Sequence, residues 1–463
     1  MASRIKNMTE GRPASLILTF ALPLMIGNIF QQFYTVVDTM VVGKALGVTA
    51  LAAIGAADWM NWMMLGIIQG ITQGFGILMA QEFGAGKYKE LRKSIGCSAT
   101  LSLLSSLLLL CAGQLIARPV LEQLQTPSAI IGNALLYLRI MYLGVPIVIS
   151  YNLFATILRS LGDSRTPLLA MVAAAIINIG LDLLFVLVFG LGIGGAAAAT
   201  LIAQLFSSLF CLCHIRKIEI LSLRPSDFSL RSHRPARLLM LGSPMAFQNA
   251  IISIGGMIVQ SVVNGFGVIF IAGFTATNKL YGVLEVAATS YGYSMVTYAG
   301  QNLGAGKIGR IRKGARAAIL ISLLTSGLIA IIMLLGGRAI LSCFISGTPK
   351  EMEQTLQIAY RYLAIMSIFL PILYLLHVIR STIQGMGNTV LPMISGIAEF
   401  IMRTATAILL PMAIGETGIF YAEVMAWAGA DLILVSSYFV TIRRAQNDST
   451  QESTSPYIRK EDA

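Results

Sequence analysis

Long apolar segments recur along the whole chain, and short polar stretches separate them. About 20 apolar residues in a helix cross the roughly 30 Å hydrocarbon core of a bilayer. Such segments occur at roughly 15–42, 51–81, 94–117, 128–158, 167–189, 193–214, 238–263, 268–300, 315–336, 352–382, 389–413 and 418–442. Backbone polar groups inside a bilayer must be satisfied within the protein, which favours helices. We therefore predict an all-α polytopic membrane protein with twelve transmembrane helices.

The composition agrees with this class of protein. Apolar residues make up 56% of the 463 residues and charged residues 12%, whereas soluble domains carry about 25% charged residues. The first apolar segment is much longer than the core of a signal peptide, so we expect it to remain attached. The five cysteines are scattered without metal-binding spacing, which favours packing roles.

The basic residues indicate how the chain crosses the membrane. Most of the 33 Lys and Arg fall in the polar stretches of one side. The opposite side holds only Lys44, Arg118, Arg338 and Lys350. Positive loops stay in the cytoplasm, so we predict a plasma (inner) membrane protein with both termini cytoplasmic. The net charge of +12 is distributed between spans, so we expect no nucleic-acid partner.

The two halves of the chain repeat each other. Gln81-Glu-Phe-Gly-Ala-Gly-Lys87 returns as Gln301-Asn-Leu-Gly-Ala-Gly-Lys307, and Gly162-Asp-Ser-Arg-Thr-Pro167 returns as Gly387-Asn-Thr-Val-Leu-Pro392. Each half has an even number of spans, so the repeats are parallel and enclose a central cavity suited to alternating access. The Gly-Ala-Gly-Lys segments lack the full phosphate-loop spacing, so we interpret them as helix caps, and ATP-driven transport is disfavoured.

The repeat and the polar stretches predict the domain organisation. It comprises a cytoplasmic arm (1–14), an N-lobe (15–215), a cytoplasmic linker (216–237), a C-lobe (238–444) and a disordered cytoplasmic tail (445–463). The linker is rich in Arg, Ser and Pro, as a connection between two bundles would be.

Ionisable residues within the apolar segments are functional candidates, because a charge at bilayer depth costs about 2.5 to 3.5 kcal/mol. The predicted topology places Asp38, Asn178, Asp182 and Thr200 at one level of the N-lobe. Asn178 and Asp182 are four residues apart and share a helix face. Such an oxygen cluster suits a small hard cation or a shared proton. The alternative is that Asp38 is solvated and the other residues tie helices together.

Several of these features together resemble the multidrug and toxic compound extrusion family. They are Pro23 with Gln31 and Asp38, the run Val41 to Gly47 with Leu51 to Ala53, the repeated Gln-x-x-Gly-Ala-Gly-Lys, Asn178 to Asp182, and Gly192 to Thr200. The resemblance implies two six-helix lobes arranged as a V that export cationic or amphiphilic compounds in exchange for Na+ or H+. It also implies a cation site of the DinF-like branch at Asp38, Asn178, Asp182 and Thr200.

Other polar residues are candidates for the substrate cavity and for ion pairing. We expect Gln31, Tyr34, Asn152 and Glu285 to line the cavity. Pro23 removes a backbone hydrogen bond in the first helix and offers a bending hinge. The second half does not repeat the Asn178 and Asp182 pattern, so the lobes are functionally unequal. Glu399 and Arg403, four residues apart, predict an ion pair inside the C-lobe.

The sequence therefore predicts a secondary active efflux transporter for amphiphilic, cationic organic compounds, driven by antiport with Na+ or H+. We expect a monomer that is not an enzyme, with small-molecule substrates, no cofactor and no metal beyond Na+ at the coupling site. Two alternatives remain. One is a flippase for lipid-linked saccharides, which needs a strongly cationic cavity, and the other is a channel or non-transporting receptor.

Overall fold

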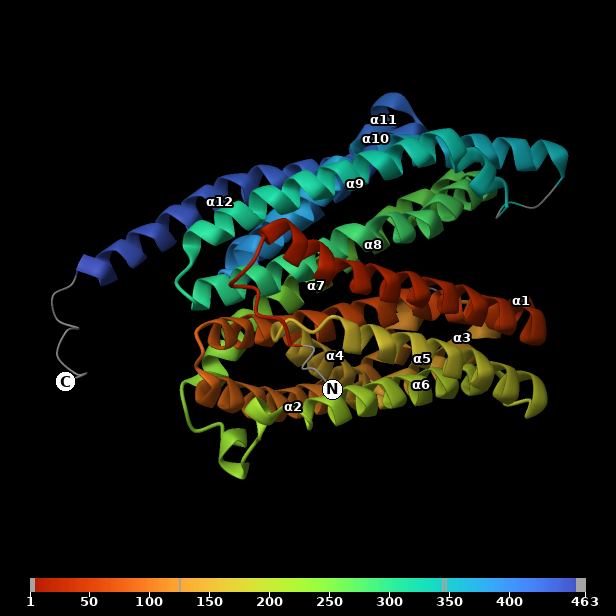
Figure 1. The fold of residues 1–463 in the computed structure, drawn as a ribbon. Helices are drawn as coiled ribbons and strands as arrows, with labels where there is room; N and C mark the ends of the chain where they lie inside the picture. The colour runs from red at the N-terminus through yellow and green to blue at the C-terminus, as the bar shows by residue number, and fades with distance from the viewer. Residues whose placement is uncertain (1–4, 125, 344, 346–347, 455–463) are drawn as a thin grey trace.

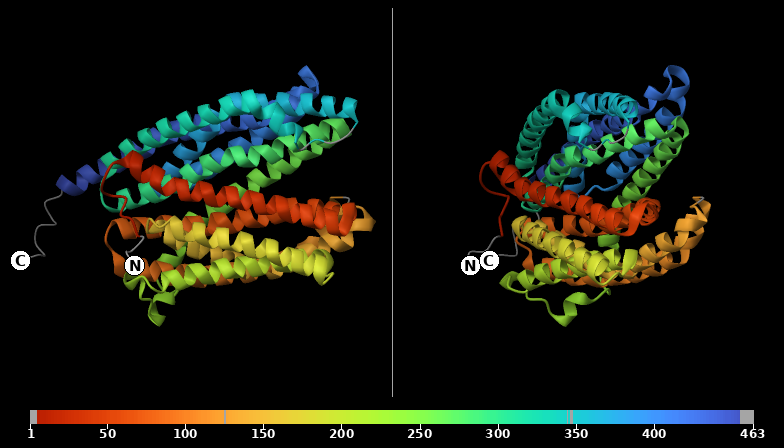
Figure 2. Two further views of the ribbon diagram at one scale, coloured as in Figure 1. Left: turned by 45° about the vertical axis from the view of Figure 1, so that its right-hand side comes forward. Right: turned by 90° about the vertical axis from the view of Figure 1, so that its right-hand side faces the viewer.

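The computed structural model describes residues 5–124, 126–343, 345 and 348–454, without the side chains of Tyr34, Val36, Thr39, Val48 and 448–454. Within these ranges the regular structure is entirely helical, as predicted. Two helical lobes lie side by side, the N-lobe built from the first half of the chain and the C-lobe from the second (Figure 1). They lie close at one end and diverge toward the other, so the bundle has the expected V form (Figures 1 and 2).

The N-lobe contains six spans in chain order. Its helices are α1 (Pro13–Gly84), α2 (Tyr88–Gln123), α3 (Ser128–Leu143), α4 (Val145–Ser160), α5 (Arg165–Asp182) with the π-helix η1 (Leu183–Val188), and α6 (Gly192–Ile215). The long α1 holds the first two spans, which meet at Gly47, where φ is +83°. A φ of that sign suits glycine, which lacks a Cβ. The bent pair α3 and α4 forms the fourth span, with an angle of 48°.

The C-lobe follows the same plan after a connection that contains two short helices, η2 (Glu219–Leu221) and η3 (Pro225–Phe228). Its helices are α7 (Arg234–Val263) with η4 (Asn264–Phe266), α8 (Val268–Gly304), α9 (Ile308–Ser342), α10 (Pro349–Gly385), α11 (Val390–Ile414), η5 (Glu416–Tyr421) and α12 (Ala422–Thr454).

The helices provide the predicted number of spans. Within the described ranges, ten segments are long and apolar enough to cross a membrane, and the bent pair brings the number to eleven. The remaining long helix, α8, has 37 residues, enough to cross, and carries Lys279 and Glu285. The twelve-helix, two-lobe layout predicted from the sequence is therefore confirmed.

The structure shifts some boundaries and corrects two predictions. The helix α12 continues to Thr454, so residues 445–454 are helical where a disordered tail was predicted, and residues 455–463 lie outside the described part. α7 begins at Arg234, inside the predicted linker. Arg380, near the end of the predicted span 352–382, lies within α10 with a side chain only 11% exposed. Its buried ion pair explains why an arginine is tolerated there.

The repeated Gly-Ala-Gly-Lys segments cap helices, as predicted. Gly86 and Gly306 both have φ of +69°. At the first copy the amide of Lys87 donates to the carbonyl of Glu82, and at the second that of Lys307 donates to Asn302. These are the bonds of a glycine C-cap, which satisfies the last carbonyls of α1 and α8. We call the end of the bundle that carries both segments the motif end.

Small residues bring the two lobes into close contact. On α1, Gly66, Gly70 and Gly74 follow one another at four-residue intervals and face α7. A Cβ at Gly70 or Gly74 would overlap backbone atoms of Ala246 or Gly242. Such small-residue stripes let helix backbones approach in membranes, where packing drives association.

At the motif end, equivalent residues of the two repeats make reciprocal contacts between the lobes. A Cβ on Gly84 would overlap the carbonyl of Gln301, and one on Gly304 would overlap that of Gln81. The Gln81 side chain donates to the Gly385 carbonyl (3.1 Å), and the Gln301 side chain donates to that of Ser160 (2.8 Å). The motif end is therefore closed in this conformation.

The N-terminal arm also bridges the lobes at this end. The amide of Lys6 donates to the Leu161 carbonyl in the N-lobe (3.2 Å). In the C-lobe, the amide of Met8 donates to the Gln301 side chain (2.8 Å), and the Lys307 ammonium donates to the Thr9 carbonyl (3.1 Å). The arm thus adds polar contacts to the closed motif end.

Gly84→Ala is expected to open the motif end, because its methyl group would overlap the Gln301 backbone. Overpacking of this kind costs roughly 1–3 kcal/mol, and about 1.4 kcal/mol changes a population tenfold. Spin labels on the exposed Lys89 and Arg312, in a cysteine-free background, would measure the distance between the lobes by pulsed electron resonance. Gly309→Ala is the matched control, since a Cβ there meets nothing within 4 Å. Unchanged distances in Gly84→Ala would contradict this account of closure.

Candidate functional site

The four residues predicted for the N-lobe cluster come together from three helices. Asp38 lies on α1, Asn178 and Asp182 on α5, and Thr200 on α6. The Asn178 amide donates to the Thr200 hydroxyl at 3.5 Å. The carboxyl groups of Asp38 and Asp182 lie close enough to interact directly. Asn178 and Asp182 are 1% and 0% exposed, so the cluster is buried.

Most oxygens of this cluster have no donor within the described residues. They are Asp38 Oδ1, Asn178 Oδ1 and both carboxylate oxygens of Asp182. An ionised carboxylate only accepts hydrogen bonds, so Asp38 and Asp182 cannot satisfy each other without a proton or a cation between them. Buried polar groups left unpaired are costly. The arrangement is therefore suited to a ligand that is positively charged and small.

The donor set favours a hard cation or a proton over a transition metal. No group of three or more His, Cys, Asp or Glu in the described ranges has metal-site geometry. Carboxylate, amide and hydroxyl oxygens are instead the ligands that hard cations prefer. The residues present thus fit Na+ or a proton.

The local structure of α5 and α6 positions the cluster. Asn178 and Asp182 lie one turn apart on α5, and the chain changes from α- to π-helix directly after Asp182. π-helical turns occur frequently at functional sites. Gln204, one turn after Thr200 on α6, also has a buried side-chain oxygen without a donor in the described part. The sequence analysis missed Gln204, because the sequence does not show which face of α6 turns toward α5.

A further acid and a base lie near this cluster. Asp58, on the second span of α1, interacts electrostatically with both Asp38 and Lys279. Lys279 lies on α8 of the C-lobe. Asp58 therefore lies near a charged residue of each lobe.

A small internal pocket of about 20 Å³ lies between the lobes near the motif end. Arg159 of α4 stacks over the ring of Tyr293 of α8, 4.5 Å from its centre, and the Gln73 amide donates to the Tyr293 hydroxyl (2.9 Å). This volume holds about one water molecule. The pocket marks the floor of the inter-lobe space, and the sequence analysis identified neither Arg159 nor Tyr293.

The predicted cavity residues have different surroundings. Asn152 lies one turn before Thr156, which lines the small pocket, and its amide donates to the Val148 carbonyl (2.9 Å). Gln31 is exposed on α1. Glu285 belongs to α8 and faces His377 of the C-lobe. The side chain of Tyr34 lies outside the described residues.

The predicted hinge at Pro23 lies inside a continuous stretch of α1. The non-helical backbone within α1 occurs at Gly47, between its two spans. In this conformation the first span is thus unbroken at Pro23, and a bent form would be a different state.

The C-lobe contains a buried network of charges instead of an oxygen cluster. Arg403 pairs with Glu399 (3.0 Å), as the sequence predicted, and also with Glu423 of α12 (2.7 Å). Arg380 of α10 pairs with Glu399 from the other side (2.7 Å). Arg403 also donates to the Ile252 carbonyl of α7 (3.2 Å), so the network joins four helices.

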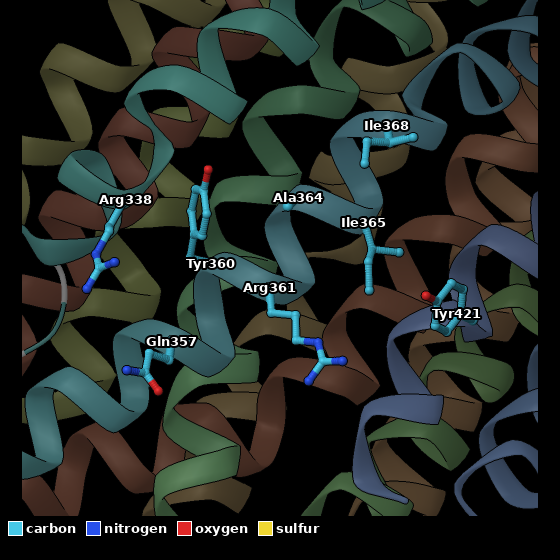
Figure 3. A pocket seen from close by; sticks show the side chains of 8 residues that line it. All are labelled: Arg338, Gln357, Tyr360, Arg361, Ala364, Ile365, Ile368 and Tyr421. Carbon is cyan, nitrogen blue, oxygen red and sulfur yellow. The ribbon is translucent and has the colours of Figure 1, made fainter. Parts of the chain in front are cut away.

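A larger pocket lies elsewhere in the described part of the chain. It measures about 390 Å³ and lies on the C-lobe between α9, α10 and η5 (Figure 3). Its lining residues are Arg338, Gln357, Tyr360, Arg361, Ala364, Ile365, Ile368 and Tyr421. Because these residues belong to the C-lobe alone, the pocket is not the inter-lobe cavity expected for substrate.

Comparison with known proteins identifies the family. The sequence matches the MatE family twice, over residues 23–184 and 244–409, which together cover most of the chain. It is 27% identical over 418 residues to the probable multidrug resistance protein YpnP of Bacillus subtilis, covering 89% of this chain and 92% of that protein. The probable multidrug resistance protein YoeA of the same organism is 28% identical, covering 82% of each chain.

Solved structures support the same fold. A structure described as an outward-facing conformation of a multidrug resistance MATE family transporter has a TM-score of 0.87, with 20% identity, and covers 96% of this chain and 99% of that chain. One MatE match lies within each six-span half of the chain. The protein is therefore a multi-pass membrane transporter that belongs to the MatE family.

Proposed function

We propose that this transporter exports amphiphilic, cationic organic compounds by antiport with Na+ or H+, and that the N-lobe cluster binds the coupling ion. The observation that carries the proposal is the set of buried oxygens without donors on Asp38, Asn178 and Asp182. A cation or proton would satisfy them together. The multidrug names of the relatives support the substrate class, because many such compounds are lipophilic cations.

The coupling follows from how ion binding changes helix packing. An ion bound between Asp38 and Asp182 would hold the first span of α1 against α5 and relieve repulsion between the two carboxylates. Antiport requires that ion and substrate prefer different states or compete for one site. We infer that the ion favours a packing of α1, bent at Pro23, in which substrate has been released.

The structure weighs against a lipid-linked saccharide flippase. Such a protein needs free positive charge in its cavity to hold a pyrophosphate group. Arg403 is instead buried in ion pairs with Glu399 and Glu423, and Lys279 lies near Asp58. The two-lobe repeat likewise favours a transporter over a channel or receptor.

The motif end is expected to face the cytoplasm of the inner membrane, together with both termini. The basic residues that follow α1 and α8 motivate this orientation. A single cysteine at Ser226, in a cysteine-free background, should resist an impermeant thiol reagent in intact cells and react after permeabilisation. A cysteine at the exposed Leu124 near the opposite end is the control and should react without permeabilisation. The reverse pattern would overturn this topology.

The purified transporter in proteoliposomes should move ethidium, a lipophilic cation, when a gradient of its coupling ion, Na+ or H+, is imposed. Antiport predicts that ethidium moves in the direction opposite to the ion flow and that it does not accumulate without an ion gradient. Liposomes without protein control for ethidium leakage. Equal transport with and without gradients would contradict coupling.

A further inference from the structure

We propose that the C-lobe contains a second ion-binding site, in which one proton is held between Glu285 of α8 and His377 of α10. The site is separate from the N-lobe cluster and shares none of its residues. The observation behind it is that His377 Nε2 lies 3.6 Å from Glu285 Oε1.

The hydrogen bond on the other side of the histidine ring fixes its tautomer. His377 Nδ1 lies 3.0 Å from the Leu373 carbonyl oxygen. A carbonyl only accepts, so Nδ1 must carry a hydrogen. A neutral ring in this tautomer presents the lone pair of Nε2 to Glu285. An ionised Glu285 would then place two acceptors against each other, which a single added proton resolves.

The proton can reside on either partner. On the carboxyl group, a Glu285 O–H bond would donate to the Nε2 lone pair, and on the ring, an imidazolium N–H would donate to the carboxylate, once the two side chains close from 3.6 Å to hydrogen-bond distance. Both forms contain one proton more than the pair of bare acceptors. Neither side chain is fully buried, since that of Glu285 is 34% exposed and that of His377 is 17% exposed.

Neighbouring contacts hold the two residues in place. The Tyr374 hydroxyl of α10 donates to the Leu284 carbonyl of α8 at 2.8 Å, next to both members of the pair. α8 also packs on α1, where the Asn28 amide donates to the Ser290 hydroxyl at 3.4 Å. The pair therefore lies on a helix that links the C-lobe to the first span of the N-lobe.

The charges around the pair independently favour an added proton. Four carboxyl groups, those of Glu285, Glu399, Glu423 and Asp431, face only two guanidinium groups, those of Arg380 and Arg403. Tyr281 and Tyr374 are the other titratable groups that interact with Glu285. Asp431 is 7% exposed and neither of its oxygens has a donor in the described part of the chain. Unpaired negative charge at this depth is costly, so proton uptake stabilises the network.

Nitrogen NMR of histidine tests the site without any transport assay. The chain has three histidines, so His214→Gln and His233→Gln leave His377 alone in 15N-histidine-labelled protein. We expect a ring protonated at Nδ1, whose Nε2 signal changes in one step as the pH is raised. Glu285→Gln should remove that step or move its midpoint by at least about one pH unit, a tenfold change in proton affinity.

The matched control is Glu353→Gln, which removes an exposed acid of the same helix as His377, about 36 Å away along its axis. This control should titrate like the parent protein. Glu285→Asp retains the charge but shortens the side chain, and it should shift the midpoint if Glu285→Gln fails to fold. A ring protonated only at Nε2, or a titration unchanged in both Glu285 variants, would overturn the proposal.

Discussion

Asp182→Asn is expected to abolish gradient-driven efflux while the protein remains folded in the membrane. Both carboxylate oxygens of Asp182 are buried without a donor in the described residues, and they face Asp38. The amide retains the shape but removes the charge that a cation or proton must neutralise. Losing an intramembrane charge eases insertion by up to about 3 kcal/mol, so expression should not fall. Efflux of ethidium from energised vesicles, at matched protein amounts, is the measurement.

Asp38→Asn should have nearly the same effect, because Asp38 supplies the second carboxyl group of the cluster. Glu122→Gln is the control, since Glu122 is 53% exposed and pairs with Arg118 at the surface. Exposed pairs contribute about 0–1 kcal/mol, so this variant should transport like the parent. Normal efflux in the Asp38→Asn, Asp182→Asn double variant would show that coupling occurs elsewhere.

Arg403→Met is expected to destabilise the C-lobe strongly. It leaves the Glu423 carboxylate without the ion-pair partner that the described residues give it, while Glu399 retains Arg380. Breaking one side of a buried pair costs roughly 3–5 kcal/mol. The expected result is a large loss of monodisperse protein in fluorescence-detected size-exclusion chromatography after heating.

A second substitution distinguishes the cost of burying an uncompensated charge from the cost of lost side-chain packing. Adding Glu423→Gln to Arg403→Met removes the uncompensated carboxylate and should restore most of the heat resistance, because an uncharged group of similar shape is less costly to bury. Glu353→Gln, which breaks the exposed pair with Arg338, is the control and should behave like the parent protein. No rescue by Glu423→Gln would show that the network is not the cause.

The sequence predicted the N-lobe cluster well, because helix periodicity and span direction place residues without reference to tertiary contacts. Asn178 and Asp182 are one turn apart on any α-helix, and the count of spans sets the level of Asp38 and Thr200. The same logic predicted the Glu399 and Arg403 pair. It could not show Gln204, whose role depends on the face of α6 that turns toward α5.

The C-lobe network was harder to predict, because its members come from four helices. Arg380 lies near the end of an apolar segment, where its charge resembles a topology signal. Only the packing of α10 on α11 reveals its partner, Glu399. Likewise, nothing in the local sequence pairs His377 with Glu285, which are 92 residues apart in the chain.

The observed helix boundaries differed from the prediction where a polar segment nevertheless forms a helix. The residues after Arg444 are polar, which predicted disorder, yet α12 continues to Thr454. Polar residues such as Gln and Glu have good helix propensity, so a helix that has left the membrane can continue into water. Apolar length therefore located the spans but not the helix ends.

Cation binding to the purified, substrate-free protein tests most directly whether the N-lobe cluster is the coupling site. Saturable binding of radioactive Na+, together with proton uptake measured in weakly buffered solution, would be compared between the parent protein, the Asp38→Asn, Asp182→Asn double variant and Glu122→Gln. We expect the parent and Glu122→Gln to bind Na+ or take up protons equally, and the double variant to lose that binding. A double variant that binds both ions like the parent protein would contradict the assignment.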